Sequence, residues 1–447
     1  MLSEGGVVAS TEAKVAHVWR RLGFGPAPGD VEAGVALGGP SQLIEDLLAR
    51  PTTTQADWNW PADQGDWQDL TRWLSRLFEN WAHSPAPVQE RVSWSLTGLL
   101  VVALTDFVQY TELKDHQNRL RAWPTTSYKA LLQDVGNSGA MQKYLTGVFS
   151  MPPHPNENLA RELMELFSLG VTHPVTGAAN YSETDVKEIA RALTGYLMDW
   201  TTLAVSHNPT YWDSGAKTFL GAARGAAKLP EVINAIAAHD SFKYFVPRRI
   251  YKELTGITPT NATLGELANV WGADGDLNAL VKHIARRPEF LADSTINNRV
   301  KSPVELLTSL TKALGYETID HFSFNWISFV LRQNPIAAPD VNGWADSVWL
   351  HPTHVLGWSN ISYWLCWGDN GTDAVAPALR NKTVRRLFAE ATSATAGDMA
   401  LRFAGLYDVS PQTREAINAY ASSGTWDYYR ACATMQLALD TPEFLVS

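Results

Sequence analysis

Carboxylates and an arginine recur at helical spacing in the segment NENLARELMELFSLG, which begins at Asn156. Glu157, Arg161 and Glu165 are four residues apart, so in a helix they stack along one face, with Glu162 beside them. Glycoside cleavage requires two carboxyl groups with separated pKa values, and Arg161 is placed to hold one of them ionised. An ion-pair ladder of small energy is the structural alternative. The pattern leaves both interpretations open.

A second set of candidates lies in the segment DSGAKTFLG, which begins at Asp213. Helical residues eight apart are about 12 Å apart, at about 1.5 Å per residue. Glu157 and Glu165 are therefore widely spaced for a catalytic pair, and Asp213 would be a closer partner for one of them. Gly215 permits close approach of a ligand to the backbone, and Lys217 is suited to bind an anionic or hydroxyl-bearing group. An ordinary turn with a solvated lysine is the alternative.

Aromatic and imidazole side chains supply further candidates. The chain has 18 tryptophans in 447 residues, which either pack the core or form a stacking platform for sugar rings or another flat or cationic ligand. Gly343 precedes Trp344 and predicts a turn that projects this indole. Trp344 is therefore the tryptophan that we expect to contact a ligand. His351 and His354 form a loose His–x–x–His pair, which is weak evidence for a metal because Pro352 favours a loop or a helix start.

Helix signals dominate the elements that must position these residues. Capping boxes open helices at Ser182 and Ser302, and Asp276 caps another. The apolar face that follows Ser182 continues to Leu197. The segments predicted to be long loops, which tend to carry function, are 51–65, 171–181, 204–230 and 334–354. We therefore expect an all-α fold, a compact multi-helix array with long loops and little or no sheet.

Length and charge limit the classes of protein to consider. The 447 residues predict one large helical domain, or two lobes at 1–228 and 229–447. A net charge of −10 disfavours a nucleic-acid-binding protein, which needs a basic face. The sequence contains no run of about 18 apolar residues, so it predicts no membrane span. The N-terminus lacks the succession of basic start, apolar run and small-residue cleavage site that a signal peptide has. Only Cys366 and Cys432 occur, which fits a reducing compartment. We expect a cytoplasmic protein, unless a leader has been removed.

The sequence lacks the motifs that are typical of several enzyme classes. No strand, glycine-rich loop and helix combination predicts a phosphate or dinucleotide site. No Gly–x–Ser–x–Gly elbow predicts a serine hydrolase. We expect no cofactor and no metal. The expected ligand is a small molecule or a glycan, and a protein partner is left open.

Five segments carry a resemblance to a known family. They are HVWRRLGFGPAPGDV from His17, NENLARELMELFSLG with YSETDVKEIARALTGY, DSGAKTFLG, RRPEFLADSTINNRVKSPVELL from Arg286, and PDVNGWADSVWL from Pro339. In this order they resemble the blocks of the bacterial domain-of-unknown-function 1800 family over nearly the whole chain. The resemblance also aligns His239 with the histidine of a His–Pro–Ala–Thr element in relatives. The family name implies no activity.

The chain departs from the family pattern at two places. The family usually has Trp–His–Asn–His–Phe where this chain has Trp94, Ser95, Leu96, Thr97 and Gly98. It also usually has histidine where this chain has Trp212, directly before Asp213. If those histidines bind a metal or carry protons in relatives, the chemistry here is different or has been lost.

These observations lead to one main hypothesis and two alternatives. The main one is an enzyme that acts on a carbohydrate or glycoconjugate, by hydrolase chemistry in a tryptophan-lined cleft. Its catalytic residues are predicted to be Glu157, Glu165 and Asp213. Its substrate-binding residues are predicted to be Asn156, Arg161, Glu162, Trp212, Lys217, His239 and Trp344. The alternatives are a non-catalytic binding or assembly protein, and a metal-dependent enzyme in which His17, His239 or His354 joins Glu157 or Asp213.

Overall fold

The chain forms two compact units, each built from segments distant in sequence. The computed structural model describes residues 8–54, 58, 60–62, 64, 68–105, 108–318, 330–344, 349, 351–368 and 379–447. Unit 1 comprises residues 1–91, 285–334 and 345–447, and unit 2 comprises residues 92–284 and 335–344. The lobe boundary predicted at residues 228 and 229 falls inside unit 2.

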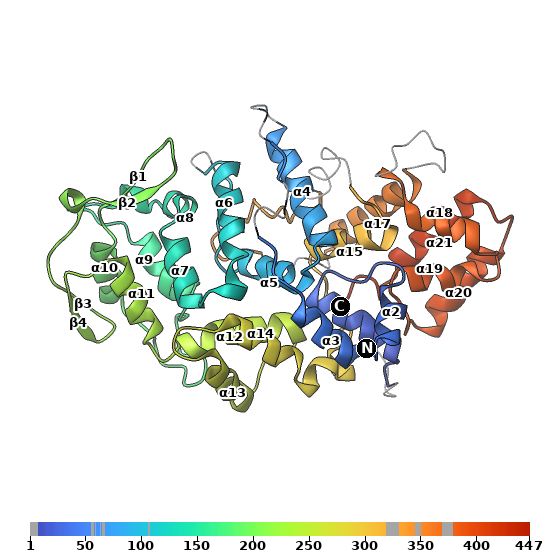
Figure 1. The fold of residues 1–447 in the computed structure, drawn as a ribbon, viewed down its shortest axis with the longest axis horizontal. Coiled ribbons are helices and arrows are strands. Elements are labelled where there is room, and N and C mark those ends of the chain that lie inside the picture. Colours follow the sequence, from blue (N-terminus) through green and yellow to red (C-terminus); the bar gives the residue numbers. More distant parts are fainter. Residues whose placement is uncertain are drawn as a thin grey trace. The chain divides into compact units, whose positions relative to one another are not determined.

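Both units are mostly helical, which confirms the predicted fold class (Figure 1). The helices of unit 1 are α1 (Thr11–Leu22), α2 (Asp30–Ala36), α3 (Pro40–Ala49), α4 (Asp69–His83), α15 (Pro303–Leu314), α17 (Pro352–Trp367), α18 (Lys382–Glu390), α19 (Ala396–Phe403), α20 (Pro411–Ser422) and α21 (Tyr428–Leu439). Helix α5 (Pro87–Thr97) begins in unit 1 and ends in unit 2. The other helices of unit 2 are α6 (Tyr110–Leu120), α7 (Tyr128–Gly136), α8 (Gly139–Tyr144), α9 (Asn158–Glu165), α10 (Glu183–Ala192), α11 (Leu229–Ala237), α12 (Phe242–Thr255), α13 (Asn261–Trp271) and α14 (Leu277–Ala285).

The predicted capping residues begin their helices as expected. The Ser182 hydroxyl accepts from the N–H of Asp185, whose carboxylate accepts from the N–H of Ser182, so α10 opens with a complete capping box. Ser302 and Glu305 form the same arrangement at α15. Asp276 Oδ1 accepts from the N–H of Ala279 at 2.8 Å, at the start of α14.

The segment after α10 differs from the prediction. The helix ends at Ala192 instead of continuing to Leu197, because Gly195 at φ 80° turns the chain into a strand. The predicted loop 204–230 is not irregular chain alone, because it contains one short antiparallel hairpin and one strand of a second hairpin that begins before it. Strands β1 (Tyr196–Met198) and β2 (Val205–His207) form one, and β3 (Lys217–Phe219) and β4 (Ala222–Gly225) form the other. Strands of three or four residues are too short to show a sequence alternation.

Many tryptophans serve as core residues. Trp73 and Trp81 are buried in unit 1, where the Trp81 ring packs against Phe78. Trp271 is buried in unit 2 and packs against Tyr128, whose hydroxyl donates to the carbonyl of Phe167 at 2.6 Å. For these residues the packing interpretation is correct.

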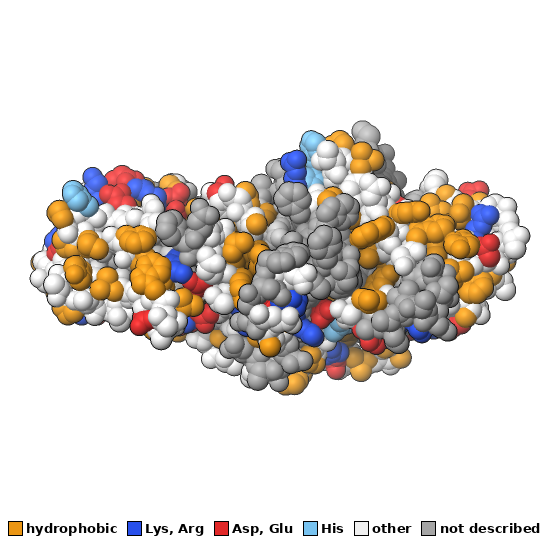
Figure 2. All heavy atoms as spheres, turned by 90° about the horizontal axis from the view of Figure 1, so that it is seen from above, with side chains coloured by type: hydrophobic (Ala, Val, Ile, Leu, Met, Phe, Trp, Pro, Cys, Tyr) orange, Lys and Arg blue, Asp and Glu red, His pale blue; other side chains and the backbone are white. Residues whose placement is uncertain are grey.

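Unit 1 also exposes large apolar side chains on three neighbouring helices. In α17, Leu356 is 68% exposed and Tyr363 is 50% exposed. Phe388 of α18 and Tyr429 of α21 are also exposed. Figure 2 shows hydrophobic side chains gathered on the surface over these helices. Among the helices that the structure describes, none is both long and apolar enough to cross a membrane.

Candidate functional site

Helix α9 presents the predicted carboxylates on a face that its own packing sets. Leu159, Leu163 and Met164 are buried, so Glu162 and Glu165 must lie toward the opposite side. The helix stops after Glu165, and the N–H groups of the next turn bond back to the carbonyls of α9. The carboxylates are therefore held on a short, well-packed helix.

Asn180 ties the end of α9 to the segment that leads into α10. Its Nδ2 donates to the carbonyls of Leu169 at 2.9 Å and Gly170 at 2.8 Å. Its Oδ1 accepts from the hydroxyl of Ser241 at 2.6 Å, and the side chain is buried. The next residue, Tyr181, is thereby positioned to donate from its hydroxyl to Glu165 Oε2 at 2.9 Å.

Glu162 is the carboxyl group in this cluster whose pKa is raised into the neutral range. Burial, and secondly the charge of Glu165, raise the pKa of Glu162 to about 7, although Arg161 opposes the shift. Oε2 of Glu162 is buried, and no described residue hydrogen-bonds to it. A pKa raised this far keeps part of the Glu162 population protonated near neutral pH, which is the state a general acid requires.

Tyr144 lies within electrostatic reach of both Glu162 and Asp340. Tyr144 ends α8, and burial together with the charges of Asp340 and Glu162 raises the pKa of its hydroxyl. Asp340 belongs to the loop 335–344, which packs on unit 2 through a bond from the N–H of Leu104 to the carbonyl of Ile336 at 2.7 Å. This loop brings a residue from the second half of the sequence close to Tyr144 at the end of α8.

The same loop carries Trp344, as the sequence predicted. Gly343 adopts φ 80°, and its N–H donates to the carbonyl of Asp340 at 3.1 Å, so the predicted turn exists. The Trp344 ring lies 5.4 Å from the ring of Trp94, and its Nε1 is buried with no partner among the described residues. The indole is only partly buried, so part of its surface is accessible to a ligand.

Arg161 is engaged in ion pairs rather than left for a ligand. Its guanidinium donates to both carboxylate oxygens of Glu183 at 2.8 Å, and to Glu157 at 3.3 Å. Asn156 is equally engaged, because its Nδ2 donates to the hydroxyl of Thr146 at 2.6 Å. Glu157, Arg161 and Asn156 thus stabilise the start of α9 and its link to α10.

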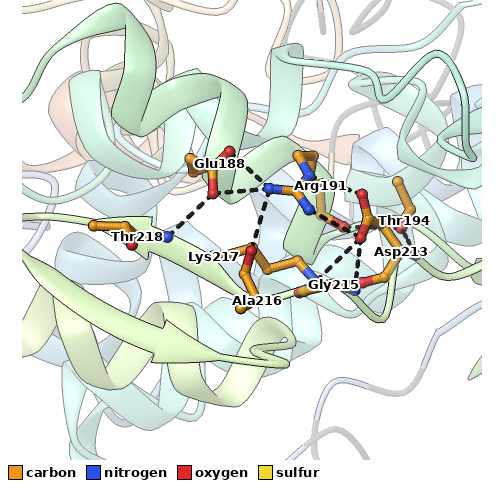
Figure 3. A network of polar contacts seen from close by, with 8 residues as sticks. All are labelled: Glu188, Arg191, Thr194, Asp213, Gly215, Ala216, Lys217 and Thr218. Atoms are coloured by element: carbon orange, nitrogen blue, oxygen red, sulfur yellow. Dashed lines mark hydrogen bonds and ion pairs between the residues drawn. The ribbon is translucent and has the colours of Figure 1, made fainter.

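Asp213 lies in a separate network on the far end of α10 (Figure 3). Arg191 donates to it from Nε at 2.7 Å and from Nη2 at 3.2 Å, and these bonds lower the pKa of Asp213. Arg191 also binds Glu188, which accepts from the N–H of Thr218 at 3.1 Å. The network fastens the β3–β4 hairpin to α10. No bond connects Asp213 with Glu162 or Glu165 among the described residues.

Lys217 is buried inside this second network. Its ammonium donates to the carbonyls of Asp213 and Gly215 and lies 5.0 Å from the ring centre of Trp212. Burial lowers the pKa of Lys217. Lys228 lies 4.7 Å from the same ring. Trp212 therefore acts as a cation–π partner for two lysines at the position where the family resemblance places histidine.

The candidate histidines are divided between the two units. His17 is buried in unit 1, with Nε2 2.9 Å from the carbonyl of Phe290, and His354 is buried in the same unit. His239 belongs to unit 2, where it follows the end of α11 and accepts from the N–H of Ser241 at 3.2 Å. Across the residues described here, no three histidine, cysteine or acidic side chains gather in a way that could hold a metal ion.

The structure thus divides the predicted site into two clusters in unit 2. Glu162 and Glu165 form the first with Tyr181, and Asp213, Lys217 and Trp212 form the second. Tyr181, Tyr144 and Asp340 were not predicted. Tyr181 opens the segment YSETDVKEIARALTGY, yet its pairing with Glu165 depends on the hydrogen bonds of Asn180, which spacing along α9 does not reveal.

Comparison with known proteins gives a family but no activity. No curated protein and no solved structure matches this chain. The profile of the family described as "Protein of unknown function (DUF1800)" matches residues 17–446. The chain therefore belongs to the DUF1800 family, as its sequence segments predicted.

Proposed function

We propose that this protein cleaves a glycosidic bond in a carbohydrate or glycoconjugate, with Glu162 as the proton donor and Glu165 as its partner carboxylate. The observation that carries the proposal is the raised pKa of Glu162, about 7, next to a second carboxylate on the same short helix. Pairs of carboxyl groups whose environments separate their pKa values typically divide the roles of acid and base.

The proposed reaction assigns one role to each group. Protonated Glu162 gives its proton to the glycosidic oxygen as the bond to the leaving group breaks. Glu165 attacks the anomeric carbon, and water later releases the sugar while Glu162 takes the proton back. Helical residues three apart have Cβ atoms about 5–6 Å apart, which fits the short carboxyl separation of retaining enzymes, about 5–5.5 Å.

Tyr181 supports this assignment. Its hydroxyl donates to Glu165 at 2.9 Å, and burial and the Glu165 charge raise the pKa of Tyr181, so the phenol remains a donor at neutral pH. The proposal keeps Glu165 from the predicted catalytic set and moves the acid to Glu162, because Glu157 and Asp213 are held in ion pairs.

The test combines variants with a substrate panel. Turnover of 4-nitrophenyl glycosides and natural oligosaccharides is measured for the wild type, Glu162→Gln and Glu165→Gln. We expect each variant to lose about 100-fold or more in kcat. Glu266→Gln, an exposed carboxylate on α13, is the matched control and keeps full activity.

Azide distinguishes a nucleophile from a binding residue. In Glu165→Ala, azide can enter the vacated space and attack the anomeric carbon, so we expect a glycosyl azide product. If no glycoside is turned over by the wild type, or if Glu162→Gln retains its rate, the proposal is wrong.

One observation favours the non-catalytic alternative. The exposed apolar side chains over α17, α18 and α21 resemble a surface that another protein covers. Light scattering of the wild type and of Leu356→Glu would test it. A complex or oligomer that the substitution dissociates supports a binding or assembly protein, whereas a monomer in both cases argues against it.

A further inference from the structure

Unit 1 contains a cavity at the end of α19 that the proposed reaction does not use. It has a volume of about 360 Å³, at the lower end of the range for small-molecule sites. Helix α19, the loop that follows it and helix α20 all contribute to its wall. Its polar lining residues are Thr395, Asp398, Arg402, Tyr407 and Arg414.

An ion pair between the two helices fixes one side of this wall. Arg414 of α20 pairs with Asp398 in the first turn of α19. Nη2 of Arg414 also donates to the carbonyl of Tyr407 at 2.9 Å, in the loop after α19. A planar guanidinium that holds two acceptors has little freedom left. Arg414 therefore fixes the first turn of α19 and the loop that follows this helix against α20.

The same ion pair takes away the helical partner of Arg402. Asp398 and Arg402 are four residues apart on α19, a spacing at which an acid and a base commonly pair. Asp398 pairs with Arg414 instead. Among the residues that the structure describes, none forms an ion pair or a hydrogen bond with the guanidinium of Arg402. Its N–H donors are therefore available to a ligand in the cavity.

The electrostatic effect of Arg402 on Tyr407 shows that the guanidinium lies on the loop side of the cavity. Burial and a hydrogen bond to Glu32 raise the pKa of the Tyr407 hydroxyl, and the charge of Arg402 opposes the shift. The hydroxyl donates to Glu32 Oε1 at 2.9 Å, so its hydrogen is already engaged. Arg402 is thus the donor on this side, and the apolar Ala394 and Leu406 also line the cavity.

We propose that this cavity binds a small organic carboxylate, whose charged group lies on Arg402 and whose hydrocarbon part contacts Ala394 and Leu406. A guanidinium holds a carboxylate through two parallel hydrogen bonds. Asp398 offsets one of the two positive charges in the wall, which favours a ligand with a single negative charge over a phosphate dianion. The site belongs to unit 1 and is independent of the glycosidase proposal, whose residues belong to unit 2.

Calorimetric titration of the full chain at pH 7 and low salt tests this assignment with three probes. Hydrocinnamate carries a carboxylate on an apolar tail, hydrocinnamamide has the same shape without the charge, and inorganic phosphate has charge without the tail. We expect hydrocinnamate to bind with a Kd of about 1 mM or tighter. The amide and phosphate should each bind about tenfold more weakly or not at all.

Two variants of opposite expected effect locate the binding, each with its fold checked by circular dichroism. Arg402→Gln removes the guanidinium and weakens hydrocinnamate binding by about tenfold. Asp398→Asn removes the competing negative charge and strengthens binding by about threefold, which a merely structural disturbance would not do. Arg332→Gln removes an equally exposed arginine of unit 1 that does not line the cavity, so this matched control leaves the affinity unchanged.

The outcome does not depend on one variant alone. If Asp398→Asn does not fold, Arg402→Gln decides the result, because the Arg402 side chain is exposed and its replacement leaves the core intact. Absence of hydrocinnamate binding, equal binding of the amide, tighter binding of phosphate, or unchanged affinity in Arg402→Gln overturns the proposal.

Discussion

Replacing Glu162 with Gln should stabilise the protein in alkaline solution and leave it almost unchanged in acid. The folded state raises the pKa of Glu162 from its ordinary 4.5 to about 7. Below about pH 4.5 the carboxyl is protonated in both the folded and the unfolded state, so it costs nothing. As the pH rises through 7, the folded state must hold a charge that the unfolded state carries more easily, and stability is lost. Glutamine resembles the protonated acid at every pH.

The size of the effect follows from the shift. A difference of 2.5 in pKa corresponds to about 3 kcal/mol at pH above 8. Glu162 is only half-buried, so solvent screening reduces the loss to about 1.5 kcal/mol. Unit 2 has about 200 residues, and in a unit of this size 1 kcal/mol moves the melting temperature by about 2–4 °C. We expect the melting temperature of Glu162→Gln, measured relative to that of the wild type, to rise by about 3–6 °C when the pH is raised from 5 to 8.5.

The assay records melting curves of three proteins at pH 5 and pH 8.5, namely the wild type, Glu162→Gln and the control Glu266→Gln. The control corrects for the loss of one negative charge, because Glu266 is exposed on α13 of the same unit. The decisive quantity is the change in the difference between variant and wild type, not the melting temperature itself. A difference that stays constant from pH 5 to pH 8.5 would refute the argument that burial perturbs this carboxyl, and with it the assignment of the acid.

Three further substitutions test structural roles in the two units. Asp213→Asn should lower the free energy of unfolding by about 1–2 kcal/mol, since it weakens the paired bonds from Arg191; denaturation in urea measures it, and an unchanged midpoint would contradict the fastening role. Glu305→Gln should lower the free energy of unfolding by about 3–5 kcal/mol, because it removes the buried negative charge that pairs with Arg91 and Arg299; tryptophan fluorescence in urea follows it, and a loss below about 1 kcal/mol would contradict the role of this charge. Gly343→Ala should cost about 1–2 kcal/mol, because φ is 80° and the new Cβ would lie 3.1 Å from the carbonyl oxygen of Gly98; an unchanged melting temperature would mean that the loop adjusts.

Features that depend on neighbouring residues were predictable from the sequence. The capping boxes at Ser182 and Ser302 involve residues three positions apart, so local spacing determines them. The turn at Gly343 is equally local. The helical fold follows from the same kind of signal, because amphipathic periodicity and caps are properties of short windows.

Features that depend on tertiary contacts were not predictable. Spacing along α9 indicated Glu157 and Glu165 as a pair with Arg161 between them, yet Arg161 takes Glu183 from the next helix as its main partner. Glu162 is perturbed because packing buries it, and burial is not visible in helical spacing. Asp340 approaches Tyr144 only because the loop 335–344 folds onto unit 2, far from its neighbours in sequence.

The altered family element in α5 bears on where proton transfer can take place. Where the resemblance places histidines, this chain has Ser95 and Thr97. Thr97 is buried, and its hydroxyl lies 3.0 Å from the carbonyl of Ser93 and 3.2 Å from Oε1 of Gln117, so it fills a structural position. Neither serine nor threonine titrates near neutral pH, and neither replaces imidazole as a proton carrier or metal ligand. Chemistry that requires a proton near pH 7 must therefore use another group, and Glu162 has the appropriate pKa.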